Sequence, residues 1–116
     1  MTFGKLVTKS GKVIVDPCLR TTNVFDRMRG LLLRPPPNPG AGLLIDPCAS
    51  VHTLAMSYPI DVVYLGEDYR IVRCVDHMKP WRMSACKGAR MTLELAAGQA
   101  QALGVEPAVE LEWQAS

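Results

Sequence analysis

The sequence predicts one small, β-rich α+β domain whose sheet is mainly antiparallel and curled or barrel-like. About seven short apolar runs alternate with turn residues, and only two segments have the spacing of short helices. The connections between the runs are too short for the crossovers that a parallel sheet needs. The chain has 116 residues, the length of a single domain, so we assign residues 1–116 to one unit.

The first two runs, residues 3–8 and 12–15, flank Ser10-Gly11. Turn residues between two apolar runs predict a β-hairpin. We expect Asp16-Pro17 to end the second strand, because proline has no N–H to donate to a sheet.

Residues 23–33 show the clearest helical pattern. The apolar positions repeat at i, i+4, i+7 and i+8, and Phe25 widens the stripe: Val24, Met28, Leu31 and Leu32. Thr22 or Asn23 can cap the first turn. We expect Gly30 to lie inside this helix, where a glycine allows another backbone to approach closely. The prolines at 35–37, followed by Pro39-Gly40, stop the helix and form a stiff extended connection.

The rest of the chain is mostly strand. Further apolar runs occupy residues 42–45, 50–56, 60–65, 69–75, 90–95 and 108–113. In the run 90–95, Met91, Leu93 and Leu95 share one face, while Thr92 and Glu94 point to the other. Residues 76–89 form a polar, basic loop with one tryptophan, and residues 96–103 a short helix ended by Gly104. The small residues Ala97-Gly98 and Ala100 let this helix pack tightly on the sheet.

The composition is that of an ordinary globular protein and excludes a disordered chain. Hydrophobic residues make up 48% and charged residues 21%, with a net charge of only +2. This balance does not require a polyanionic partner. No run reaches the ~18 apolar residues of a membrane span, and the first residues carry no export signal. We therefore expect a cytoplasmic protein without membrane contact; its oligomeric state stays open.

The four cysteines, at positions 18, 48, 74 and 86, form no C-x-x-C pair, so we expect free thiols. Cys48 and His52 would share one face of a strand and could both bind zinc. The other candidate ligands are scattered along the chain. The sequence therefore predicts no metal and no cofactor.

Asp61 is the most informative single residue, because it interrupts an apolar strand on the face of Val63 and Leu65. A buried carboxylate needs a cation, several N–H donors or a proton. We favour a structural anchor, paired with an arginine such as Arg29 or capping the loop around Pro59, over a catalytic acid or base.

Three ordered motifs carry a resemblance to a known family. They are Arg29-Gly30-Leu31-Leu32-Leu33-Arg34; the segment 48–56 (CASVHTLAM) with 59–65 (PIDVVYL); and Leu93-Glu94-Leu95-Ala96-Ala97-Gly98 with Leu103-Gly104. Over residues 5 to 113 the chain resembles the bacterial and archaeal "domain of unknown function 192" family. The resemblance implies a compact β-rich fold with flanking helices and implies no activity. One departure is Glu106-Pro107-Ala108, where the family has a Gly-Asp turn.

We hypothesise a non-catalytic accessory domain that binds a small molecule or a protein in a groove lined by His52, Met56 and Asp61. One alternative is a small hydrolase-like enzyme that uses His52 and Asp61. Its nucleophile would be Cys48 or Thr53. No nucleophile motif supports it, and the adjacent Thr53 and His52 point to opposite faces of a strand. A second alternative is nucleic-acid binding through the loop from Lys79 to Arg90, around Trp81. The nearly neutral charge disfavours nucleic acid.

Overall fold

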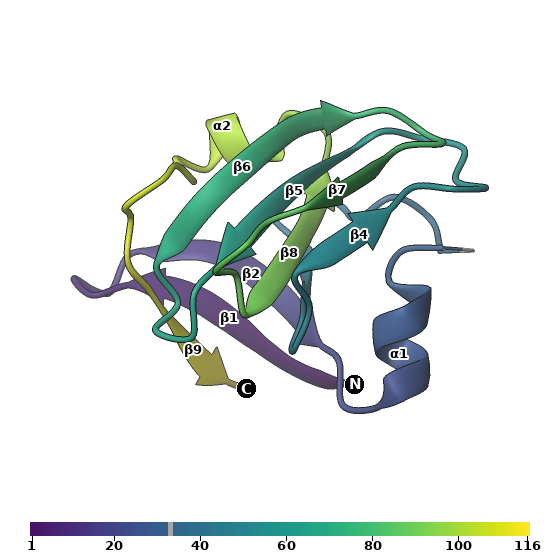
Figure 1. Cartoon of the computed structure of the whole chain (residues 1–116). Coiled ribbons are helices and arrows are strands. Elements are labelled where there is room, and N and C mark those ends of the chain that lie inside the picture. The colour runs from purple at the N-terminus through teal and green to yellow at the C-terminus, as the bar shows by residue number, and fades with distance from the viewer. Residues whose placement is uncertain (33) are drawn as a thin grey trace.

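The computed structural model describes residues 1–32 and 34–116 and folds them into a curled sheet, a two-stranded ribbon and two short helices (Figure 1). The elements are β1 (Thr2–Thr8), β2 (Val13–Arg20), α1 (Val24–Arg29), β3 (Gly42–Ile45), β4 (Ser50–His52), β5 (Ile60–Leu65), β6 (Ile71–Met78), β7 (Met83–Ala85), β8 (Met91–Ala96), α2 (Gln99–Ala102) and β9 (Leu111–Ala115). Seven strands form the main sheet in the order β6-β5-β8-β3-β2-β1-β9, and β4 pairs with β7.

The main sheet is antiparallel except for the parallel pair β2–β3. It does not close into a barrel, but its two edges meet at one end. There Ile71 N–H donates to the Val109 carbonyl at 2.9 Å, and Leu111 N–H donates to the Tyr69 carbonyl at 3.2 Å. The β-rich α+β class with a curled, mainly antiparallel sheet is confirmed.

Each face of the sheet buries its own hydrophobic cluster, so the central strands are covered on both sides. One cluster gathers residues such as Leu6, Val63 and Leu93 with Ala100 of α2. The other gathers residues that include Leu43, Val62 and Tyr64 with Leu31 and Met56. All six residues of β5 are buried as a result. The predicted alternation in β8 is present, yet Thr92 and Glu94 are buried as well.

Strand β2 continues through Asp16-Pro17, so the expected strand end there is wrong. Leu6 pairs with Val15 and Gly4 with Cys18, which leaves Asp16 and Pro17 opposite the single residue Lys5. This is a β-bulge, and it accommodates proline because bulged residues need not donate to the neighbouring strand.

The first helix differs from its prediction in length and in burial. Asn23 caps it, accepting the Asp26 N–H at 2.9 Å, but α1 ends at Arg29. None of its residues is buried: Phe25 is 83% exposed and Met28 71%. Among the apolar residues of the expected stripe, Leu31 is buried, beyond the helix end. Leu33, the last residue of the predicted helix, lies outside the described residues.

The polar segment 76–89, predicted as loop, contains the end of β6 and all of β7. Strand β7 pairs with β4 and lays a ribbon over the sheet face that carries Val62 and Tyr64. The run 50–56 is a strand only as far as His52. Helix α2 is shorter than residues 96–103 and packs on β5 and β8 through Ala100, as its small residues predict.

Candidate functional site

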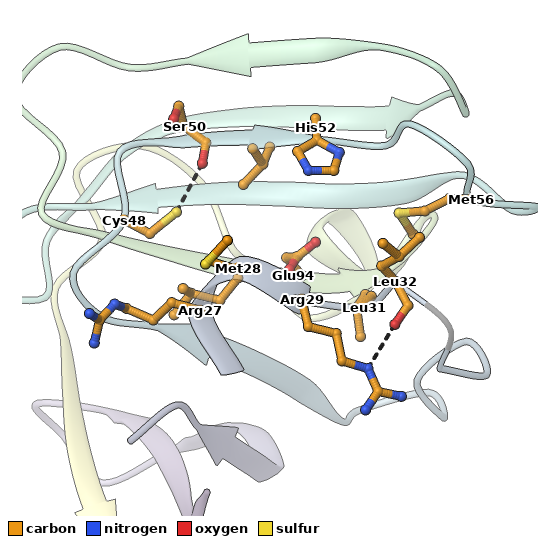
Figure 2. Close-up of a pocket in the computed structure, with 13 residues that line it drawn as sticks. Arg27, Met28, Arg29, Leu31, Leu32, Cys48, Ser50, His52, Met56 and Glu94 are labelled. Carbon is orange, nitrogen blue, oxygen red and sulfur yellow. Dashed lines mark hydrogen bonds between the residues drawn. The ribbon is translucent and has the colours of Figure 1, made fainter. Parts of the chain in front are cut away.

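A small cleft lies between β4 and the turn that follows α1 (Figure 2). We call it the Glu94 cleft. Its described lining comprises Arg27, Met28, Arg29, Gly30, Leu31, Leu32, Ile45, Cys48, Ser50, Val51, His52, Met56 and Glu94. Its volume is about 50 Å³. That space holds a few water molecules or the end group of a larger ligand, since a single buried water needs on the order of 10–15 Å³.

Glu94 provides the carboxyl group at the base of this cleft. Its neighbours in the sheet are Leu43 on β3 and Val62 on β5, and the residue is only 3% exposed. Burial raises the pKa of Glu94 to about 7, although a hydrogen bond with the Leu31 backbone acts in the opposite direction. Near neutral pH this carboxyl can therefore both accept and donate a hydrogen bond.

The turn after α1 is shaped around Glu94. Gly30 ends the helix with φ 52° and ψ −128°, a conformation that favours glycine. A Cβ at this position would stand 2.7 Å from Glu94 Oε1. The close neighbour of Gly30 is therefore a side chain, which corrects the expected approach of a backbone. The Tyr58 hydroxyl reaches the carbonyls of Leu31 and Arg34, at 3.2 and 2.9 Å, and holds the turn in place.

The opposite wall of the cleft is β4 with the residues that precede it. Cys48 Sγ donates to the Ser50 carbonyl at 2.9 Å, and Thr92 Oγ1 donates to the Cys48 carbonyl at 2.9 Å. His52 is exposed at the rim of the cleft and pairs with Met83 of β7. These contacts fix β4 relative to β8, so the cleft is largely preformed.

Thr53, considered above as a nucleophile, is fully buried and its hydroxyl is in use. It donates to the Lys79 carbonyl at 2.6 Å and accepts the Arg82 N–H at 2.9 Å. Its backbone N–H also donates to the Arg82 carbonyl. Thr53 therefore anchors the segment that leads into β7.

The structure brings two of the three predicted groove residues together. His52 and Met56 line the Glu94 cleft, whereas Asp61 is not among its lining residues. On β5, Asp61 shares the face of Val63, and Met56 packs in the cluster on the other face. His52 and Asp61 are therefore not assembled into the polar pair that the hydrolase-like alternative requires.

Asp61 is fully buried and holds two backbone segments. One carboxylate oxygen accepts the His77 N–H and the other the Ala100 N–H, both at 2.9 Å. The first bond ties Asp61 to the end of β6, and the second to the first turn of α2. The anchor that we expected uses these backbone donors in place of Arg29 or the loop around Pro59.

Glu94 was not predicted as a site residue, although the sequence contains a signal for it. Glu94 interrupts the apolar strand Leu93-Glu94-Leu95, as Asp61 interrupts β5. Alternation placed Glu94 on the face opposite Leu93, and nothing in the local pattern showed that this face is covered. The cover comes from β4, β7 and the turn after α1, which are distant in sequence.

Cysteine and histidine side chains form no metal cluster within the part of the chain that the structure describes: no three His, Cys, Asp or Glu residues there are placed to hold an ion. All four cysteines are free thiols. Cys48 and His52 both line the Glu94 cleft, although Cys48 precedes β4, so the two do not share the face of one strand as expected. The absence of a bound metal stays a prediction, which elemental analysis of the purified protein tests.

The basic residues between 79 and 90 are partly engaged in contacts within the protein. Arg90 Nε lies 3.1 Å from Asp46 Oδ1, and Arg82 Nη1 donates to the Trp81 carbonyl at 3.3 Å. The Trp81 residue is 64% exposed. The segment therefore offers an exposed aromatic ring but only part of the positive charge that its composition suggested.

The fold and the cleft define a class: a small β-rich α+β domain with one buried carboxyl group at the base of a preformed cleft. The model of the DUF192 family, described as "Uncharacterized ACR", matches residues 8–113. The chain belongs to this family, which confirms the resemblance read from the three motifs. No curated protein matches the chain.

Two solved structures share the fold. One is a protein of unknown function from Novosphingobium aromaticivorans DSM 12444, with 23% identity and a TM-score of 0.75 over 96% of this chain and 84% of that one. The other is a candidate transcription regulator from Sinorhizobium meliloti 1021, with 24% identity and a TM-score of 0.80 over 97% of this chain and 92% of that one. At these identities the likeness shows the fold alone. Within the described residues, no helix has the length and apolar content needed to cross a membrane.

Proposed function

We propose that this protein is a non-catalytic binding domain, which takes an end group of a small molecule or a protein partner into the Glu94 cleft. The observation that carries the proposal is a convergence. The three motifs that identify the family are far apart in sequence, and each contributes to this one cleft: Gly30 and Leu31 from the first, His52 and Met56 from the second, and Glu94 from the third.

The size of the cleft limits what it can bind. Pockets for whole small molecules usually have volumes of about 300–1,000 Å³. A cleft of about 50 Å³ instead suits one functional group presented by a larger partner. The rest of that partner would lie over the rim, where Met28 is 71% exposed and His52 is accessible.

The chemistry of the lining suggests the kind of end group. Glu94 supplies a carboxyl group that is only 3% exposed, and a hydrogen bond that is shielded from water is stronger than one in water. Leu31, Val51 and Met56 provide apolar contacts around it. In Figure 2 the guanidinium groups of Arg27 and Arg29 extend away from Glu94. An amine or amide on a short apolar stem fits these features, because it would donate to Glu94 while its stem packs on the walls.

The rival functions have weaker support. The enzyme hypothesis loses its polar pair, because Asp61 packs on the face of β5 opposite the cleft. A nucleic-acid role receives some support from the name given to the Sinorhizobium meliloti structure, at 24% identity. The engagement of Arg90 with Asp46 reduces the charge available for phosphate contacts.

Backbone amide NMR titration tests the proposal. We expect n-butylammonium to shift the Gly30, Leu31 and Val51 resonances, and n-butanol, which lacks the charged donor, to shift them much less. Glu94→Gln should abolish the difference between the two probes, because it removes the carboxylate at nearly constant shape. Glu112→Gln, on the exposed part of β9, is the matched control and should retain it. Equal responses to the two probes in the unmodified protein would refute the proposed role of Glu94.

A further inference from the structure

A row of directly paired residues crosses the sheet face that carries Glu94. Phe3 pairs with Leu19, Leu19 with Leu43, and Leu43 with Glu94. Paired residues on neighbouring strands point to the same side of a sheet. The turn after α1 covers this row at Glu94, but the other end is open, and Phe3 is 60% exposed.

The open end of the row is one side of a second, larger depression, which we call the proline groove. Phe3, Leu19, Leu31, Leu43, Arg34 and the prolines at 35–37 are among its lining residues. Its volume is about 350 Å³, within the range of pockets that bind whole small molecules. Leu31 and Leu43, 5% and 2% exposed, are buried residues of its lining.

The proline groove is also largely preformed. Consecutive prolines restrict the backbone on one side, so little conformational entropy is lost when a ligand binds. The regular strands β1 to β3 form the other side. The Tyr58 hydroxyl bonds to the carbonyls of Leu31 and Arg34 and fixes the segment between the groove and the Glu94 cleft.

The charge among the described residues that line the proline groove is positive. Arg34 is its single charged residue, and no acidic side chain is found among the described residues that line it. Arg34 Nε donates to the Gly30 carbonyl at 2.9 Å, which orients the guanidinium group. The terminal Nη groups can then bind a carboxylate through two parallel hydrogen bonds.

We propose that the proline groove binds a small apolar carboxylate, such as a medium-chain fatty acid or an arylalkanoic acid. Its tail packs on Leu19 and Leu43, and its carboxylate pairs with Arg34. This site is distinct from the Glu94 cleft in lining, size and charge, although Leu31 contributes to both. The inference therefore does not depend on the function proposed for the cleft.

Titration with octanoate and octanamide, followed by backbone amide NMR, tests the inference. We expect octanoate to shift the Leu19, Gly42 and Leu43 resonances and to bind about tenfold or more tightly than octanamide, because the carboxylate gains charge-assisted hydrogen bonds. Arg34→Gln should remove this preference. Arg73→Gln, on β6 far along the sheet order, is the matched control and should keep it.

A groove-filling variant, Ala41→Trp, gives an independent check, because Ala41 lines the proline groove and not the cleft. It should abolish octanoate binding while the thermal unfolding transition remains cooperative. Equal affinity for octanoate and octanamide would overturn the carboxylate assignment. It would indicate that the groove instead binds an apolar side chain of a protein partner. Shifts confined to residues outside the groove, or no binding of octanoate, would overturn the site.

Discussion

The carboxylate of Glu94 and the α-carbon of Gly30 fit against each other so closely that a Cβ on residue 30 would stand 2.7 Å from Glu94 Oε1. Two motifs that are more than sixty residues apart in the chain therefore meet at van der Waals distance. The glycine lets the turn after α1 lie directly on the buried carboxyl group, and this contact forms the base of the Glu94 cleft.

Gly30→Ala should destabilise the protein by roughly 2–4 kcal/mol. A backbone with positive φ costs a non-glycine residue about 1–2 kcal/mol, and the contact with Glu94 adds to that cost. Urea denaturation measures the loss. Gly11→Ala is the matched control, because Gly11 also has positive φ (93°) but would place its Cβ in open space. A loss no larger than that of Gly11→Ala would contradict the close contact.

The stability of the protein should fall as the pH rises through neutrality, because the folded state binds a proton at Glu94 more tightly than the unfolded chain. The pKa of Glu94 is about 7 in the folded state, against an ordinary value of 4.5. The stabilisation is therefore fully present below pH ~4.5 and is lost as the pH rises to about 7 and above. The upper limit of the effect is between about 3 and 4 kcal/mol, at about 1.4 kcal/mol per tenfold change in proton affinity.

Glu94→Gln isolates this contribution, since glutamine does not titrate. We expect the free energy of unfolding of the variant minus that of the unmodified protein to be larger at pH 8 than at pH 5, because only the unmodified protein loses stability when Glu94 ionises. Urea denaturation of both proteins at the two pH values gives the comparison. A difference between the proteins that is independent of pH would show that Glu94 titrates normally.

Asp61→Asn should cost on the order of 1–3 kcal/mol of stability. The carboxylate accepts two backbone N–H groups, and an asparagine presents an NH₂ group to one of them, so a buried donor loses its partner. Thermal or urea unfolding measures the loss, and Asp76→Asn, at an exposed position of β6, is the control. Unchanged stability together with a lost binding activity would reassign Asp61 to a functional site.

Nucleic-acid binding should be weak and sensitive to salt. Lys79, Arg82, Lys87 and Arg90 could contact at most about four phosphates, and Arg90 is paired with Asp46. A base stacked on Trp81 contributes only ~1–3 kcal/mol. Fluorescence anisotropy with labelled single-stranded DNA and RNA at physiological salt is the measurement. Submicromolar binding that disappears in Trp81→Ala would place the protein in the nucleic-acid-binding class.

The sequence alone predicted the fold class, the first hairpin, the strand at 60–65, a helix cap at Thr22 or Asn23, and the family. These features depend on local patterns: alternation, turn residues and motifs that lie within a few residues of each other. It also predicted that Asp61 needs buried partners, because a carboxylate within an apolar strand must have donors or a proton. The identity of those partners, the backbones of His77 and Ala100, did not follow, since both come from other elements.

Only the tertiary structure decided where α1 faces and what covers Glu94. The apolar stripe of α1 follows helical spacing, yet it is exposed, because the helix ends at Gly30 and Leu31 beyond it enters the core instead. The alternation in β8 predicted which face of the sheet Glu94 points to, but not whether that face is exposed to solvent or buried. Burial depends on the ribbon of β4 and β7 and on the turn after α1, whose positions are set by contacts between distant parts of the chain. The site is therefore a product of long-range packing, while the elements that build it are specified locally.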